Sequence, residues 1–187
     1  MDFISNYSVQ NSDVSLGAGV CSEDEKSYLH RPCFNVNIRL YKSSRRYRQI
    51  VQKSIRYMKS LFNKKYEDYP EIKGVSGANL AIPFNIIVVK DGKKLIPMIN
   101  PVTTHTSQFN EMSIVRSNCG SLQLNEPITV KRFDKIRVRY INILGNYIYE
   151  FFDKPLSFTI QHEIDHNNGI TIEDKHKEIE IADTILY

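Results

Sequence analysis

The stretch Gln161-His162-Glu163-Ile164-Asp165-His166 decides the interpretation of this chain. Its two histidines are four positions apart, so on a helix both imidazoles project from one face and can bind a single metal ion. Glu163 then lies beside the ion, where the glutamate of metallohydrolases with this pattern takes a proton from water. The sequence therefore predicts a metal site built on a helix, and the alternative is a surface helix with two unrelated histidines.

The residues around this stretch favour a helix. We expect Asp153 to cap its start, Pro155 to lie in its first turn and Asn168-Gly169 to end it. An apolar row along the segment would face the core and comprises Leu156, Ile160 and Ile164.

A catalytic metal site needs a third protein ligand, and the sequence offers two kinds. Glu173, Glu178 and Glu180 follow the histidines, but little chain remains before Tyr187. An upstream cysteine thiolate would serve equally well, and Cys119 is available.

The arrangement resembles the peptide deformylases, which remove the formyl group from the N-terminal methionine of new polypeptides. Their third motif, H-E-x-x-H after Gln, is matched by Gln161 to His166, with Gly169 close behind. Their second motif, E-G-C-L-S, is matched only by Cys119 and Ser121. Their first motif, G-x-G-L-A-A-P-Q, corresponds to Gly77-Ala78-Asn79-Leu80-Ala81-Ile82-Pro83-Phe84. The resemblance covers about residues 29 to 174.

The resemblance implies one divalent metal ion held by Cys119, His162 and His166, with ferrous iron as the first choice and zinc or nickel as alternatives. It also implies that Glu163 is the general base and that the backbone N–H of Gly120 stabilises the oxyanion. N-formylated nascent peptides would be the substrate. The residues expected to bind it are Gly77, Ala78, Asn79, Leu80 and Thr159.

Several positions depart from the family pattern. The first-motif glutamine, an oxyanion donor, is Phe84, and the second-motif glutamate, the usual partner of the arginine matched by Arg132, is Ser117. Gly120 replaces a leucine and Asn79 a glycine. Three interpretations follow: a divergent deformylase, a deformylase-fold hydrolase with another acyl or peptide substrate, or a binding protein that keeps the metal for its structure.

Length and composition predict one catalytic domain, residues 29–187, after a polar N-terminal arm, residues 1–28. Three cysteines without regular spacing do not form a disulfide framework, so we expect Cys21 and Cys33 to be free thiols. The sequence has no long apolar stretch and no apolar signal segment. We expect a soluble, cytoplasmic protein with neither DNA nor a membrane as partner.

Residues 44–65 have the apolar period of an amphipathic helix. Ten of the 25 Lys and Arg residues lie between Arg39 and Lys65, and no acidic residue lies among them. The first interpretation of this basic face is a solvated helix surface, because no aromatic residues interleave for base stacking. The alternative is a contact with the ribosome, through its RNA, or with another polyanion.

Strand patterns dominate the rest and predict an α+β fold with antiparallel sheets around a central metal-binding helix. Turns at Asp91-Gly92 and Gly145-Asn146 predict two hairpins. Alternating residues near the end of the chain predict strands there, and no basic C-terminal helix. The expected strands are 86–89, 94–99, 128–130, 136–143, 147–152, 170–172 and 178–181.

Overall fold

The computed structural model describes residues 29–64, 72–104, 111–117, 119, 122 and 126–185, without the side chains of residues 64 and 179–185. The N-terminal arm, Cys21 and Gly120 of the sequence analysis lie outside these residues. Within them, no helix is long and apolar enough to cross a membrane.

A five-stranded antiparallel sheet forms the centre, in the order β1-β2-β3-β6-β7. Both predicted hairpins are confirmed: β2 pairs with β3 around Gly92, and β6 pairs with β7 around Gly145. Both glycines have positive φ, 56° and 85°, which a residue with a side chain rarely adopts. The strands are β1 Gly74–Ser76, β2 Ile86–Asp91, β3 Lys94–Thr104, β6 Lys135–Ile141 and β7 Tyr147–Asp153.

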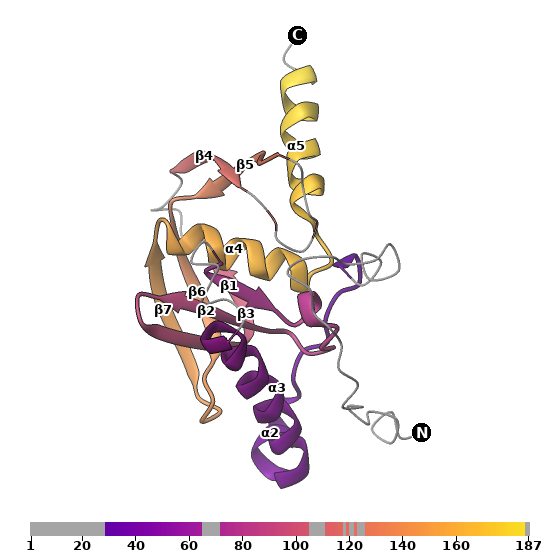
Figure 1. The fold of residues 1–187 in the computed structure, drawn as a ribbon, viewed down its shortest axis with the longest axis vertical. Helices are drawn as coiled ribbons and strands as arrows, with labels where there is room; N and C mark the ends of the chain where they lie inside the picture. Colours follow the sequence, from indigo (N-terminus) through magenta and orange to yellow (C-terminus); the bar gives the residue numbers. More distant parts are fainter. Residues whose placement is uncertain are drawn as a thin grey trace.

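Helices cover the two faces of this sheet (Figure 1). Helices α2 (Ile38–Ser43) and α3 (Arg45–Lys64) lie on one side, and α4 (Leu156–Asn167), the helix with the two histidines, lies on the other. A second sheet of two antiparallel strands, β4 (Met112–Ser117) and β5 (Ile128–Phe133), lies against α4 from outside. The predicted fold, antiparallel sheets around a central helix, is confirmed.

Alternation along β2 supplies both cores. Ile86 and Val88 point to the α3 side, where they pack with the predicted apolar face of that helix, including Val51. Ile87 points to the opposite side and packs with Ile160 of α4. Strand β2 is therefore buried on both faces, and this explains its continuous apolar run.

The start of α4 corrects one expectation. Asp153 does not cap the helix, because it is the last residue of β7 and its carboxylate lies 3.3 Å from Lys135 Nζ. Pro155 occupies the cap position, where it provides no side-chain hydrogen bond. The predicted end is confirmed: Asn168 is the C-cap, and Gly169 follows with a φ of 76°.

The structure also corrects the expectation of strands near the end of the chain. Residues 170–172 and 178–181 are not strands, because the single helix α5 (Ile172–Ile185) spans most of this segment and extends away from the body (Figure 1). Thr171 Oγ1 and Asp174 Oδ2 lie 2.7 Å apart, the Thr171 N–H donates to the same carboxylate, and the Asp174 N–H donates to Thr171 Oγ1. This reciprocal cap starts the helix and outweighs the two-residue alternation of Glu178-Ile179-Glu180-Ile181. A C-terminal helix is thus present, although acidic and not basic residues begin it.

Candidate metal centre

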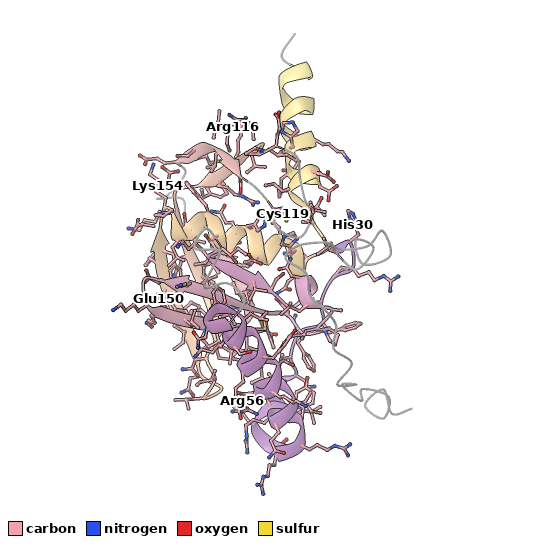
Figure 2. The ribbon with its side chains drawn as sticks, viewed as in Figure 1. His30, Arg56, Arg116, Cys119, Glu150 and Lys154 are labelled. Atoms are coloured by element: carbon pink, nitrogen blue, oxygen red, sulfur yellow. The ribbon has the colours of Figure 1, made fainter. Side chains whose placement is uncertain are left out.

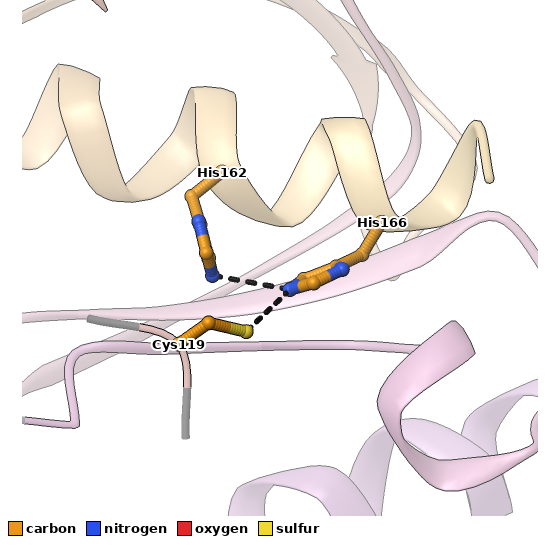
Figure 3. A group of neighbouring side chains, drawn as sticks. All are labelled: Cys119, His162 and His166. Atoms are coloured by element: carbon orange, nitrogen blue, oxygen red, sulfur yellow. Dashed lines mark hydrogen bonds between the residues drawn. The ribbon is translucent and has the colours of Figure 1, made fainter. Parts of the chain in front are cut away.

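Three potential metal ligands face one another beside α4. His162 and His166 project from the same face of the helix, with their Nε2 atoms 3.1 Å apart (Figure 3). Cys119 Sγ lies 3.4 Å from His166 Nε2. One ligand atom from each residue lies within 4.8 Å of the other two, so the group could hold an ion.

Cys119 reaches the histidines because the outer sheet is fastened to α4. The Gln161 side chain accepts a hydrogen bond from the Phe133 N–H and donates one to the Phe133 carbonyl, at 3.0 and 2.9 Å. Arg132, also on β5, is buried and forms an ion pair with Asp165. Both contacts hold β5 on the helix. Strand β4 pairs with β5 and ends two residues before Cys119.

The thiol of Cys119 is enclosed by apolar side chains. It is 1% exposed and belongs to a buried cluster with residues from distant parts of the chain: Leu29, Ala78, Leu122, Val130 and Ile172. The sulfur therefore lies in a largely dry site, open toward the imidazoles.

Burial keeps both imidazoles neutral. Loss of water lowers the pKa of His166 to about 4, and the positive charge of Arg132 acts in the same direction. Burial and the neighbouring His166 lower the pKa of His162 well below its usual value. A neutral imidazole is the form that binds metal. The donor set of one sulfur and two nitrogens fits a zinc-like or ferrous ion, so the residues present fit a divalent cation.

Glu163 is a buried acid next to His162 on α4, and its side chain lies against strand β1. Burial raises its pKa to about 8, while a hydrogen bond from Ser76 and the charge of Arg132 oppose that rise. A Cβ added to Gly74 would lie 2.7 Å from Glu163 Cγ, from its Oε1 and from Thr159 Cγ2. Glycine at position 74 is therefore required for this close approach.

The residues expected to bind substrate do not all lie together. Thr159 faces β1 across Gly74. Ala78 donates its N–H to Asn167 Oδ1 at the end of α4, and Asn79 Oδ1 accepts a hydrogen bond from the backbone N–H of Ser76. The N–H of Gly77, which precedes them, bonds to the Ile86 carbonyl. Leu80, however, packs with the cluster on the α3 side of the sheet.

Phe84 also lies on the α3 side. Its ring packs edge-on against Tyr47 of α3, with centroids 6.1 Å apart. The ring therefore does not occupy a place beside the histidines. Two segments meet α4: Gly74 and Ser76 of β1 lie against Glu163, and Ala78, in the first-motif match, bonds to Asn167 at the end of the helix.

Sequence reasoning missed three residues that organise the centre. Asn167 is buried and donates to Asn85 Oδ1 and the Ile86 carbonyl, which ties the end of α4 to β2. Asp165 forms the ion pair with Arg132, and Ser76 bonds to Glu163. An asparagine inside a helix, directly after a ligand, was the one available signal, since Asn disfavours helix interiors.

An α+β fold in which a cysteine lies against two histidines of the central helix defines a candidate metal-binding protein. The sequence profile of the family described as polypeptide deformylase matches residues 28–181. The chain belongs to this family. The peptide deformylase of Pseudothermotoga lettingae is 29% identical over 136 residues, which cover 72% of this chain and 75% of that protein. The peptide deformylase of Rhodopseudomonas palustris BisB18 is 32% identical over 108 residues, 54% of this chain and 60% of that one.

Solved structures share the fold. A class I type b peptide deformylase of Acinetobacter baumannii superposes with a TM-score of 0.65 at 20% identity, over 84% of this chain and 96% of its own. The peptide deformylase of Vibrio parahaemolyticus bacteriophage VP16T, in complex with actinonin, has a TM-score of 0.60 at 21% identity, over 83% and 98% of the two chains. At these identities the likeness concerns the fold alone.

Proposed function

We propose that this chain is a divalent-metal-dependent hydrolase that removes the formyl group from the N-terminal methionine of nascent polypeptides. The observation that carries the proposal is the grouping of Cys119, His162 and His166 beside the buried Glu163. Membership of the polypeptide deformylase family supports the reaction class. Ferrous iron is the metal we favour, and zinc or nickel suits the same ligands.

The three ligands would hold the cation, which when bound would polarise the formyl carbonyl and make water a better nucleophile. Glu163 takes the proton of the attacking water on its carboxylate and then delivers it to the leaving amine. Its burial favours the protonated form between these two steps. The Gly120 N–H, outside the described residues, would donate to the developing oxyanion.

We place the methionine side chain beside Thr159 and the segment from Gly74 to Asn79. Thr159 and Glu163 both lie against Gly74, so a substrate held there is within reach of the proposed base. The backbone N–H of Ser76 donates to Asn79 Oδ1, so the Ser76 hydroxyl can donate its hydrogen to Glu163 and hold the base in place.

A second substrate class is favoured by one observation. The side chain at position 84, which the family motif would make a glutamine, is an aromatic ring on the far side of the sheet. With that amide missing, another acyl or peptide group could be the preferred substrate, and a panel of N-acyl peptides beside the formyl peptide separates the two proposals.

Turnover of formyl-Met-Ala-Ser by anaerobically iron-loaded protein tests the main proposal. Glu163→Gln should retain the metal and lose turnover, because Glu163 is placed to move protons rather than to bind the ion. Cys119→Ala should lose both. Retained metal in wild type with no turnover of the formyl peptide would contradict the proposed substrate.

We also propose that the basic helix α3 contacts the ribosome. Arg45, Arg46, Lys53 and Arg56 are exposed on it, and Arg56 lies on the opposite side of the sheet from Cys119 (Figure 2). A ribosome bound there would leave the metal centre open to a nascent chain. Co-sedimentation with ribosomes should weaken when these four residues are changed to Glu, and should fall steeply with salt. If salt does not affect the binding, the basic residues of α3 are not the ribosome contact, and α3 is a solvated helix surface.

A further inference from the structure

Within the part of the chain that the structure describes, no helix covers strands β6 and β7 on the α3 side of the central sheet. The apolar cluster under α3 reaches β6 only at Ile141. Beyond it, alternate residues of β6 and β7 point to the same side, because their neighbours Val138 and Phe152 face α4. The β6–β7 face consists of Lys135, Arg137, Arg139, Tyr147, Tyr149 and Phe151.

Aromatic and basic side chains interleave on this face. Tyr147, Tyr149 and Phe151 are 58%, 54% and 48% exposed, so three large rings follow one another along one strand. Arg139 lies opposite Tyr149 in the strand pairing, and Arg137 lies opposite Phe151. Soluble proteins seldom leave contiguous apolar groups uncovered without a partner.

The cations hold the rings in place. Arg137 Cζ lies 5.1 Å from the centre of the Tyr149 ring and 5.7 Å from that of Phe151, and Lys135 Nζ lies 5.8 Å from the latter. These are cation–π distances. Among the residues of β6 and β7, Asp153 is the acidic residue on this side and pairs with Lys135, whereas Glu150 points to the α4 side and bonds to Tyr140. The face is therefore positive and its rings are preorganised.

The β6–β7 face continues toward the basic helices. Tyr41 of α2 donates its hydroxyl hydrogen to the Ile143 carbonyl in the turn after β6, and Gln52 of α3 donates to that hydroxyl oxygen. A Cβ at Gly145 in the same turn would lie 3.2 Å from Lys42 Cε. The basic helices α2 and α3 therefore adjoin the edge of the β6–β7 face.

We propose that the β6–β7 face binds a single-stranded nucleic acid, with bases stacked on the rings and phosphates on the arginines. Rings that stack bases of any sequence beside cations that bind the backbone are the two elements of such sites. Rings two residues apart on a strand are about 6.6 Å apart, about twice the 3.4 Å spacing along one strand of a duplex. Neighbouring bases could stack on successive rings only if they no longer stacked on each other. A single strand can adopt such a conformation, but a duplex cannot.

This surface lies on the other side of the sheet from the metal centre and does not depend on the proposed hydrolysis. On α3 a single aromatic residue, Tyr57, is well exposed among the cations, whereas three exposed rings follow one another here along β7. An acidic peptide would use the cations but leave the rings without a role.

Fluorescence anisotropy of a short fluorescein-labelled single-stranded RNA of mixed sequence, titrated with the metal-loaded protein, tests the proposal. Tyr149→Thr should weaken binding roughly 5- to 150-fold, the range for removal of one stacking ring, and Tyr149→Phe, which keeps the ring, should bind as wild type does. Arg139→Gln should lower the slope of log K against log salt by about 0.7, the value for one phosphate contact on a single strand. Phe34→Ala and Lys93→Gln, an exposed aromatic residue and an exposed cation outside both α3 and the β6–β7 face, are the matched controls and should bind as wild type does.

Four outcomes would overturn the proposal. Equal affinity of Tyr149→Thr and wild type, with far-UV circular dichroism unchanged, would mean that charge alone binds the RNA. A duplex RNA or polyglutamate bound as tightly as the single strand would show a general charged surface. Tighter binding to vesicles of anionic lipid would make it a membrane surface. A dimer in sedimentation that Tyr149→Thr abolishes would make it an interface between copies of this chain.

Discussion

A single hydrogen atom at position 74 sets how closely β1 can approach the proposed base. Because a Cβ there would lie 2.7 Å from Glu163 Cγ and Oε1 and from Thr159 Cγ2, Gly74→Ala must move the carboxylate or the strand. We expect turnover to fall on the order of 10²-fold while metal content is unchanged, since a shift of about 1 Å in a positioned group has such effects. Metal analysis beside steady-state kinetics checks this. Gly92→Ala, in a turn where an added Cβ meets nothing within 4 Å, is the control for glycine loss and should cost stability only.

The hydroxyl of Ser76 acts on the same carboxylate. Its hydrogen bond favours the charged form of Glu163, so Ser76→Ala should raise the pKa of that residue above the value of about 8 set mainly by burial. At a given pH less of the base is then ionised, and the acid side of the pH–rate profile should move to higher pH. Ser76→Thr, which keeps the hydroxyl, should restore the wild-type profile if the buried site admits its methyl group. If the acid side of the pH–rate profile is the same in Ser76→Ala and wild type, the Ser76 hydrogen bond does not influence the ionisation of Glu163 in the active enzyme.

At the scale of elements, helix α5 depends on its cap. Thr171 is fully buried and makes reciprocal hydrogen bonds with Asp174. Thr171→Ala should lower the free energy of unfolding by about 1 kcal/mol, the usual loss for a cap of this kind, and Thr171→Ser should lose much less. Urea denaturation measures the change, and faster hydrogen exchange in α5 would locate it. Equal stability of the Ala and Ser variants would contradict the cap's role.

The elements that the sequence predicted are those with strong local signals. The hairpins follow from Gly92 and Gly145 in tight turns, and α3 from its apolar period. Helix α5 was mistaken for strands because alternation of Glu and Ile was given more weight than the capping pattern that begins at Thr171. Strand β4 was not predicted, since its exposed, short sequence gains its structure from pairing with β5.

The candidate metal site also has one part that the sequence predicts and another that it does not. Two histidines four positions apart on a helix face one way, and this is a local property that the sequence carries. Cys119 lies against the histidines because Gln161 and Arg132 hold β5 on α4. The spacing of residues in the sequence does not reveal these contacts. From the sequence alone Cys119 is one of several possible ligands, and only the family resemblance singles it out. The close approach of Gly74 to Glu163 could not be predicted, because it requires the packing of β1 on α4.

For the whole molecule, a bound cation would join the outer sheet to the central helix. Cys119 follows β4, whereas both histidines belong to α4, so metal binds the folded arrangement and not the separate parts. Removal of metal should therefore lower Tm, and the stability gained should grow with free metal concentration by about 1.4 kcal/mol per tenfold above Kd. Differential scanning fluorimetry with and without chelator measures this. Cys119→Ala should no longer respond to metal, while Glu163→Gln should respond as wild type does.

The enclosure of Cys119 has a consequence for the order of events in folding. Leu29 and Ile172, which are far apart in the sequence, belong to the same buried cluster as Cys119, and the Cys33 N–H bonds to the Asn167 carbonyl across 134 positions. Contacts this distant in sequence form slowly, because the intervening loop must close first. In a stopped-flow refolding experiment the two hairpins should therefore form before the protein acquires the ability to capture an ion, and Leu29→Ala should delay that capture more than it delays hairpin formation.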